Sequence, residues 1–166
     1  MSQPREPQLR PRTLTVNGER RIVEVEDRKL LLDALREDLE LTGAHAGCEH
    51  GVCGACTVLL DGLPVRSCLM FVGQAEGHRI ETVESLADGA ELHPLQRAFI
   101  ENLGFQCGYC TPGMLLTAKE FLERNPTPTD DEAREAISGN LCRCTGYMGI
   151  VRSIVQAAEA MRREPR

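Results

Sequence analysis

The chain of 166 residues contains 19 Lys and Arg against 25 Asp and Glu, which gives a formal net charge of −6. This acidic balance argues against a nucleic-acid partner, because nucleic acids favour proteins with clustered Lys and Arg. No stretch reaches the roughly 18 consecutive apolar residues of a membrane span, so we expect no span. The first 12 residues contain no apolar signal core, and we expect a cytoplasmic protein.

The N-terminal half carries signals for strands and tight turns. Asn17-Gly18 and Asp61-Gly62 each stand between short β-like runs, and these residue types tolerate the positive φ angles of a two-residue hairpin turn. We expect residues 1–11, which are polar and rich in proline, to form a disordered tail. The predicted elements that follow are strands at 13–16 and 21–26, a helix at 29–38, and strands at 57–60, 64–67 and 78–83. This order is that of a β-grasp domain, which we assign to residues 12–86.

Helix signals dominate after residue 88, and we assign residues 87–166 to a second, all-α domain with four helices. Pro94 and Pro112 suit the first position of a helix, and Thr129 opens a capping box. We expect Leu103 on the core face of the first helix and Gly104 at the C′ position after its end. The predicted helices span about residues 94–103, 111–124, 130–138 and 149–163. The fold class is therefore α+β.

The first four of the eight cysteines have the spacing of a plant-type [2Fe–2S] site. Cys48, Cys53 and Cys56 follow a Cys-x4-Cys-x2-Cys pattern, and Cys68 comes after the Asp61-Gly62 hairpin. Reduced thiols in a protein without a secretory signal favour metal binding over disulfides. The glycines of this loop let backbone N–H groups approach the sulfurs, which a negatively charged cluster needs.

The other four cysteines lie in two loops of the predicted helical domain. Cys107 and Cys110 form Cys-x2-Cys between the first two helices, and Cys142 and Cys144 form Cys-x-Cys between the last two. If both loops meet at one end of a four-helix bundle, four thiolates come together. Cys110 also directly precedes a helix start, where the positive end of the helix dipole stabilises a thiolate.

A zinc site and a Rieske centre fit the cysteines less well than two iron–sulfur clusters do. The first cysteine set lacks the paired Cys-x2-Cys knuckles of structural zinc sites. A Rieske centre needs a second Cys-x2-His motif beside Cys48-Glu49-His50, and the sequence has none. We expect His50 to face solvent and assign no role to the remaining histidines, His45, His78 and His93. No nucleotide-binding glycine motif or catalytic nucleophile is present, so we expect no independent active site. A free-standing ferredoxin and a zinc-bearing structural module remain as alternative functions.

Three segments together resemble the small iron–sulfur subunit of the molybdenum hydroxylases, the family of xanthine dehydrogenase, aldehyde oxidoreductase and carbon monoxide dehydrogenase. The segments are residues 47–56 (GCEHGVCGAC), 106–114 (QCGYCTPGM) and 139–147 (GNLCRCTGY). The resemblance covers about residues 12–162 and all eight cysteines. It implies an N-terminal plant-ferredoxin-like β-grasp domain followed by a four-helix-bundle domain, each with one [2Fe–2S] cluster.

The resemblance also implies partners and a path for electrons. A large subunit carries molybdopterin, as the cytosine dinucleotide in many bacterial relatives, and a medium subunit carries FAD. Electrons pass from molybdenum through the helical-domain cluster, then through the ferredoxin-like cluster, to the flavin. Gln106 and the backbone around Cys144 are expected beside the pterin. Relatives assemble as dimers of heterotrimers, and their substrates include carbon monoxide, purines, N-heteroaromatic compounds and aldehydes. The sequence does not choose among these substrates.

Overall fold

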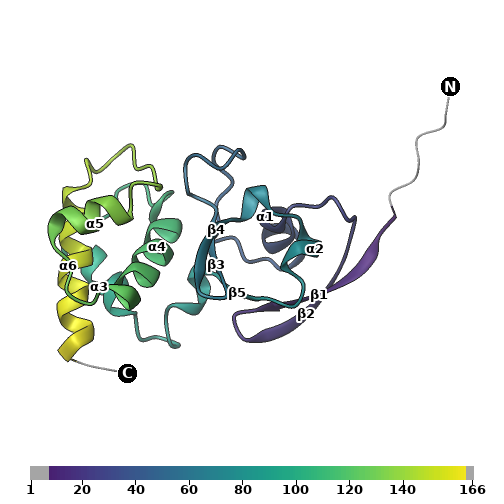
Figure 1. Ribbon diagram of the computed structural model, residues 1–166, viewed down its shortest axis with the longest axis horizontal. Coiled ribbons are helices and arrows are strands. Elements are labelled where there is room, and N and C mark those ends of the chain that lie inside the picture. Colours follow the sequence, from purple (N-terminus) through teal and green to yellow (C-terminus); the bar gives the residue numbers. More distant parts are fainter. Residues whose placement is uncertain (1–7, 164–166) are drawn as a thin grey trace.

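The computed structural model describes residues 8–163 and contains one mixed sheet and a separate group of helices (Figure 1). The strands are β1 (Arg10–Val16), β2 (Glu19–Val25), β3 (Thr57–Leu60), β4 (Leu63–Arg66) and β5 (Arg79–Glu81). They lie in the order β2-β1-β5-β3-β4, with β1 and β5 parallel and all other neighbours antiparallel. The predicted β-grasp domain is confirmed.

Both predicted hairpin turns form as the residue types require. Asn17 and Gly18 have φ angles of 52° and 81°, and Asp61 and Gly62 have φ angles of 50° and 85°. Two successive positive φ angles match the twist of antiparallel strands, which explains the choice of Asn-Gly and Asp-Gly. The second hairpin, β3–β4, matters for the site described below because Cys56 and Cys68 flank it.

The structure differs from the sequence prediction at the beginning of β1. Arg10 and Pro11 pair with Val25 and Glu24 of β2, so the prediction of a disordered tail was wrong for these two residues. Pro11 is tolerated because β5 pairs with β1 only at Thr15 and Val16, which leaves the other edge of β1 open at Pro11. Residues 1–7 of the predicted tail lie outside the described residues.

The helix predicted over residues 29–38 is shorter and changes type. It consists of α1 (Leu31–Asp33) and a π-helical turn, η1 (Ala34–Asp38), in which the N–H of Leu39 donates to the carbonyl oxygen of Ala34 at 3.0 Å. The predicted apolar face is correct, since Leu31, Ala34 and Leu35 are all buried. The remaining short elements of this domain are η2 (Ser67–Leu69), α2 (Val72–Ala75) and η3 (Val83–Ser85).

The four helices predicted in the second half are all present. They are α3 (Pro94–Glu101), α4 (Thr111–Arg124), α5 (Asp130–Ala136) and α6 (Met148–Arg163). The predicted capping box forms, because the Thr129 hydroxyl accepts from the N–H of Glu132 and the Glu132 carboxylate accepts from the N–H of Thr129. Helix α5 ends at Ala136, before the predicted stop at Gly139.

The end of α3 differs from the prediction by one residue. Leu103 was predicted in the core, but its side chain is 77% exposed and its φ angle is 52°. The N–H of Leu103 donates to the carbonyl of Ile100, and the N–H of Gly104 donates to that of Phe99, so Leu103 is C′ and Gly104 is C″ of a Schellman motif. Gly104 is needed for packing, since a Cβ atom there would lie 2.9 Å from Ser153 Oγ of α6.

The two domains pack against each other along α4. This helix contacts β3 and β4, and Leu59 of β3 is fully buried within the helical core. Figure 1 shows α4 beside β3 and β4, with α3, α5 and α6 on the far side of α4. None of the described helices is long and apolar enough to cross a membrane. The division of the chain between residues 86 and 87 stays a prediction.

Candidate metal centres

The sheet domain gathers the first four cysteines around the start of the β3–β4 hairpin. Cys56 directly precedes β3 and Cys68 follows β4, and both side chains are at most 3% exposed. Hairpin register brings them together, because the backbone N–H and hydroxyl of Ser67 both donate to the carbonyl of Cys56, at 3.4 and 2.7 Å. Burial, followed by the hydrogen bond with Cys56, raises the pKa of the Cys68 thiol to about 11.

The rest of the first set lies in the loop before β3, which bends through several left-handed residues. The N–H of Cys53 donates to Cys48 Sγ at 3.4 Å. Backbone N–H groups of Cys53 and then His50 lower the pKa of the Cys48 thiol to about 6. Gly51 in this loop has a φ angle of 83°, a conformation that glycine adopts without strain. The loop therefore points N–H donors at sulfur, as the glycine-rich sequence predicts.

The helical domain brings the second four cysteines to one end of the bundle. Cys110 is the N-cap residue of α4, and Cys107 Sγ lies 3.4 Å from Cys144 Sγ of the loop between α5 and α6. Although Cys110 stands at a helix start, burial, followed by a hydrogen bond with Cys142, raises the pKa of its thiol to about 12, so burial outweighs the predicted stabilisation of the thiolate by the helix dipole. Cys142 Sγ in turn lies 3.1 Å from the Thr145 hydroxyl. The two loops thus meet as the sequence predicts.

The sulfurs of the second set are arranged as two pairs, Cys107 with Cys144 and Cys110 with Cys142. Two sulfurs bound to one tetrahedral metal ion at about 2.3 Å lie about 3.8 Å from each other, close to the observed separation of the first pair. Among residues 8–163, no group of three or more His, Cys, Asp or Glu side chains is gathered for a single metal ion. Two thiol pairs fit a cluster with two irons, each iron taking two thiolates.

A cavity of about 240 Å³ lies between the two sets. It is lined by Gly47, Cys48, Cys53, Ala55, Cys107, Tyr109, Cys110, Leu141, Cys142, Arg143 and Cys144. Six of these residues are cysteines, two from the first set and four from the second. Cys48 and Cys53 of the first set and all four cysteines of the second therefore face the same space, although the two sets belong to different domains.

Asn140 joins the two cysteine-bearing regions. Its side chain is nearly fully buried, donates from Nδ2 to the carbonyl of Gly54 at 3.1 Å, and accepts at Oδ1 from the Thr117 hydroxyl at 3.0 Å. Next to it, the N–H of Leu141 donates to the carbonyl of Cys53 at 2.9 Å. Asn140 has no role predicted from the sequence, where its only distinguishing feature is its position two residues before Cys142.

The predicted exposure of His50 is confirmed, and the other three histidines make local or inter-domain contacts. His50 is exposed, His78 lies 2.6 Å from Asp61, and His93 caps α3 through Nδ1. The hydrogen bond from His78 lowers the pKa of the Asp61 carboxyl. His45 stacks on Tyr109 of the other domain with ring centroids 4.6 Å apart.

Gln106, the predicted pterin contact, is exposed and directly precedes Cys107. Because Cys107 and Cys144 are in contact, Gln106 and the Cys144 backbone lie at the same end of the bundle. Cys144 is itself exposed, in contrast to the buried Cys56 and Cys68. The two predicted contact residues thus belong to one accessible surface.

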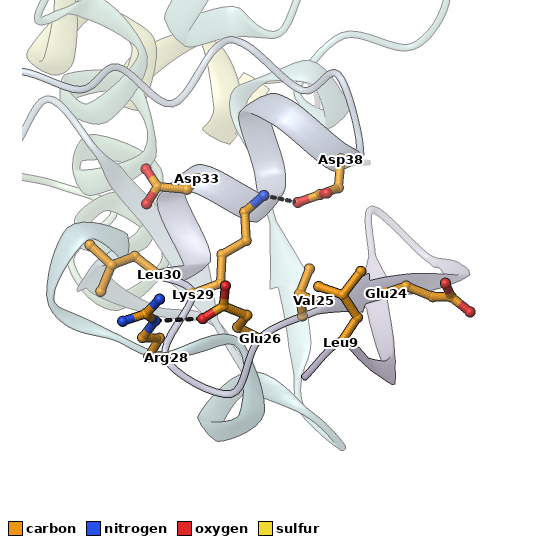
Figure 2. A pocket seen from close by; sticks show the side chains of 9 residues that line it. All are labelled: Leu9, Glu24, Val25, Glu26, Arg28, Lys29, Leu30, Asp33 and Asp38. Carbon is orange, nitrogen blue, oxygen red and sulfur yellow. Dashed lines mark hydrogen bonds and ion pairs between the residues drawn. The ribbon is translucent and has the colours of Figure 1, made fainter. Parts of the chain in front are cut away.

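A larger hollow lies elsewhere, between the end of β2 and α1, and has a volume of about 550 Å³ (Figure 2). Its wall contains no cysteine. Four of its six charged side chains are paired: Arg28 lies 2.5 Å from Glu26, and Lys29 lies 2.7 Å from Asp38. This arrangement offers no metal ligand set.

Two protein-family models match the chain and together cover both regions. The "2Fe-2S iron-sulfur cluster binding domain" matches residues 14–90, and the "[2Fe-2S] binding domain" matches residues 82–155. The first match contains Cys48 to Cys68 and the second contains Cys107 to Cys144. The division into two iron–sulfur modules therefore agrees with the structure.

Comparison with individual proteins places the chain among subunits of oxidoreductase complexes. It is 58% identical over 142 residues to the nicotine 6-hydroxylase small subunit of Paenarthrobacter nicotinovorans, covering 86% of each chain. It is 56% identical over 145 residues to caffeine dehydrogenase subunit gamma of Pseudomonas sp. (strain CBB1), covering 86% of this chain and 87% of the relative. A chain of the crystal structure of quinoline 2-oxidoreductase from Pseudomonas putida 86 superposes with a TM-score of 0.91 at 53% identity, over 96% of this chain and 99% of that one.

The fold, the cysteine spacing and these relatives agree. The chain belongs to the small iron–sulfur subunits of the molybdenum hydroxylases and is an electron-transfer subunit of an oxidoreductase complex.

Proposed function

We propose that this chain holds two [2Fe–2S] clusters and relays electrons from molybdopterin cytosine dinucleotide on a large subunit to FAD on a medium subunit. When bound, each cluster supplies a one-electron carrier, and the protein holds and tunes both carriers. The ligand sets are Cys48, Cys53, Cys56 and Cys68, and Cys107, Cys110, Cys142 and Cys144. The observation that carries the proposal is the cavity of about 240 Å³ that is lined by Cys48 and Cys53 of the first set and by all four cysteines of the second.

The surroundings of the two sets suit different positions in the relay. Cys56 and Cys68 are buried in the sheet domain, whereas Cys107 and Cys144 are exposed at the end of the bundle. A protein sets the reduction potential of a cluster through burial and through hydrogen bonds to its sulfurs. Two sets with unlike exposure can therefore hold clusters with unlike potentials, which an ordered relay requires.

The exposed end of the helical domain is suited to a partner surface. Apolar side chains are exposed there on three segments: Leu103 at 77%, Leu141 at 52% and Met148 at 53%. Leu103 and Met148 are close because Gly149 packs against the carbonyl of Leu103. Grouped exposed apolar side chains beside a cofactor site favour a protein interface. We assign this end of the bundle to the interface with the large subunit. We also expect two heterotrimers to pair. The cytoplasmic location stays a prediction of the sequence.

The relatives named above are subunits of complexes named for nicotine, caffeine and quinoline. Nicotine, caffeine and quinoline are all N-heterocyclic compounds. We propose that the complex containing this chain also oxidises an N-heterocyclic substrate. The substrate itself is expected to bind the large subunit, so no residue of this chain is assigned to its recognition.

Purification of the complex through a tag on this chain tests the proposed function. A large and a medium chain should co-purify, with about four iron and four sulfide per small subunit and two S = 1/2 EPR signals after reduction. An N-heterocyclic compound should bleach the clusters, and an aldehyde should not. A chain that purifies alone with two irons would support a free-standing ferredoxin, and zinc without iron would support a structural module. Bleaching by aldehydes alone would contradict the substrate class.

Gln106 is proposed to contact the pterin, because it is exposed and adjoins Cys107 at the accessible end of the bundle. Gln106→Ala should keep all the iron and both EPR signals. Reduction of the clusters by substrate should slow by about tenfold, the size typical of losing an outer partner of a metal site. Gln8→Ala, at an exposed position before β1, is the control and should change nothing. Loss of iron in Gln106→Ala would contradict the assigned contact.

A further inference from the structure

Tyr109 lies between Cys107 and Cys110 of the helical domain, but its side chain contacts the cysteine loop of the sheet domain. Its hydroxyl donates to the carbonyl of Ala46 at 2.7 Å. Its own carbonyl oxygen lies 2.7 Å from Nδ1 of His45, which must be the donor because a carbonyl only accepts. The two rings are stacked with an interplanar angle of 23°. Three separate contacts thus link one residue of the second loop to two residues of the first.

Each end of this link is attached to a cysteine set. On one side, the N–H of Tyr109 is hydrogen-bonded to Cys107, which is the main cause of the lowered pKa of that thiol. On the other side, Ala46 lies two residues before Cys48, and the N–H of His45 donates to the carbonyl of Ala55 at 3.2 Å. Tyr109 is therefore fixed at the second set, and His45 and Ala46 are fixed at the first.

The tyrosine ring also forms part of the wall between the sets. A Cβ atom on Gly47 would lie 3.0 Å from Cys53 Sγ and 3.6 Å from Cε1 of Tyr109. The chain at Gly47 therefore passes closely between the tyrosine ring and a sulfur of the first set. Tyr109 and Gly47 both line the cavity of about 240 Å³ that the cysteines of both sets share.

We infer that His45 and Tyr109 form an inter-cluster clamp, a pair of positioning residues that fixes the separation of the two clusters and the hydrogen-bonded path between them. The inference rests on the proposed function, since it needs two clusters. The step that the clamp serves is the transfer of one electron, by which one cluster is oxidised and the other is reduced, with no bond made or broken. Transfer rates fall steeply with distance, so a looser clamp slows this step.

The clamp is distinct from the contacts that hold the domains together. Asn140 is buried between the domains, and Arg66 donates to the carbonyl of Gly139 at 2.6 Å. These contacts remain when the clamp is removed, so the domains should stay packed. His45 is half-buried and Tyr109 is exposed, and stacking of such rings contributes little to stability beyond area burial. Their removal should therefore alter coupling between the clusters far more than stability.

The test uses the purified complex with Tyr109→Leu, Tyr109→Phe and His45→Leu. Iron content is measured first, then the spin–spin splitting of the fully reduced clusters by EPR, and then the rate of electron arrival at the first set by freeze-quench after substrate is added. Tyr109→Leu should keep about four irons, reduce the splitting, and slow arrival by about tenfold. Tyr109→Phe keeps the ring but loses the bond to Ala46, so it should fall between Tyr109→Leu and wild type.

A control variant and a wild-type measurement distinguish failure of the clamp from failure of the proposed function. His78→Leu removes an exposed histidine that contacts Asp61 instead of Tyr109, and it should match wild type. If Tyr109→Leu loses iron, the splitting and the rate measured in His45→Leu decide whether the clamp exists. His45 does not lie between the cysteines of either set, so this variant should keep its iron ligands in place. Unchanged splitting and unchanged rate in His45→Leu and Tyr109→Phe would overturn the clamp. A wild-type complex without two clusters would instead overturn the proposed function.

Discussion

Cys142→Ala should remove about two of four irons per chain and one of two EPR signals, while the other signal remains without the spin–spin splitting that the lost cluster caused. Cys142 is half-buried between Thr145 and Cys110, so its loss leaves the second set with three sulfurs. Three thiolates cannot complete two tetrahedral irons. Cys56 and Cys68 of the first set lie in the core of the sheet domain, so this set should keep its iron.

Cys53→Ala is the reciprocal control. It should remove the other signal and leave the one that Cys142→Ala abolishes. The alanine keeps the backbone carbonyl that accepts from Leu141, so the contact between the two loops survives in this variant. Iron and sulfide analysis with EPR of the reduced complex is the measurement. If both variants lose the same signal, or if either keeps all four irons, the assignment of one cluster to each set is wrong.

Residues whose structure depends on near neighbours could be predicted from the sequence. The Asn17-Gly18 and Asp61-Gly62 turns and the Thr129 capping box form as predicted, because each depends on the φ preferences or side-chain hydrogen bonds of adjacent residues. The first cysteine set follows the same rule. Short spacings place Cys48, Cys53 and Cys56 on one loop, and the β3–β4 hairpin brings Cys68 close, whereas the second set also needs two distant loops to meet through helix packing.

Contacts between distant parts of the chain could not be predicted. Asn140 lies 86 residues from its partner Gly54, and Tyr109 lies 64 residues from His45. Neither pair has a local pattern that distinguishes it from an ordinary loop residue. Leu103 was misassigned for a related reason: the space beside Phe99 is taken by Ser153 of α6, so glycine at 104 is chosen for packing and Leu103 turns outward. Only the packed structure contains that information.

Gly113 is the residue whose substitution should most disturb the contact between the two cysteine-bearing regions. It is buried in the first turn of α4, three residues after Cys110, and faces Gly54 of the first loop. A Cβ atom at position 113 would lie 2.2 Å from the carbonyl oxygen of Gly54, a backbone atom that cannot move alone. The same oxygen accepts from Asn140 Nδ2 at 3.1 Å and from the Thr57 hydroxyl at 2.6 Å.

Gly113→Ala should therefore lower the free energy of unfolding, although alanine favours a helix by about 1 kcal/mol over glycine. Overpacking against backbone costs about 1–3 kcal/mol or more, and displacing Gly54 also weakens the hydrogen bonds of Asn140 and Thr57. We expect Tm to fall by several degrees and the EPR signal of the first set to broaden. Gly73→Ala in α2 is the matched control, because its nearest neighbour is the Arg12 guanidinium at 3.8 Å, and it should be neutral or stabilising. A Gly113→Ala protein as stable as wild type would mean that α4 and the first loop can separate without a loss of stability. The contact between Gly113 and Gly54 would then not be what holds the two cysteine sets together.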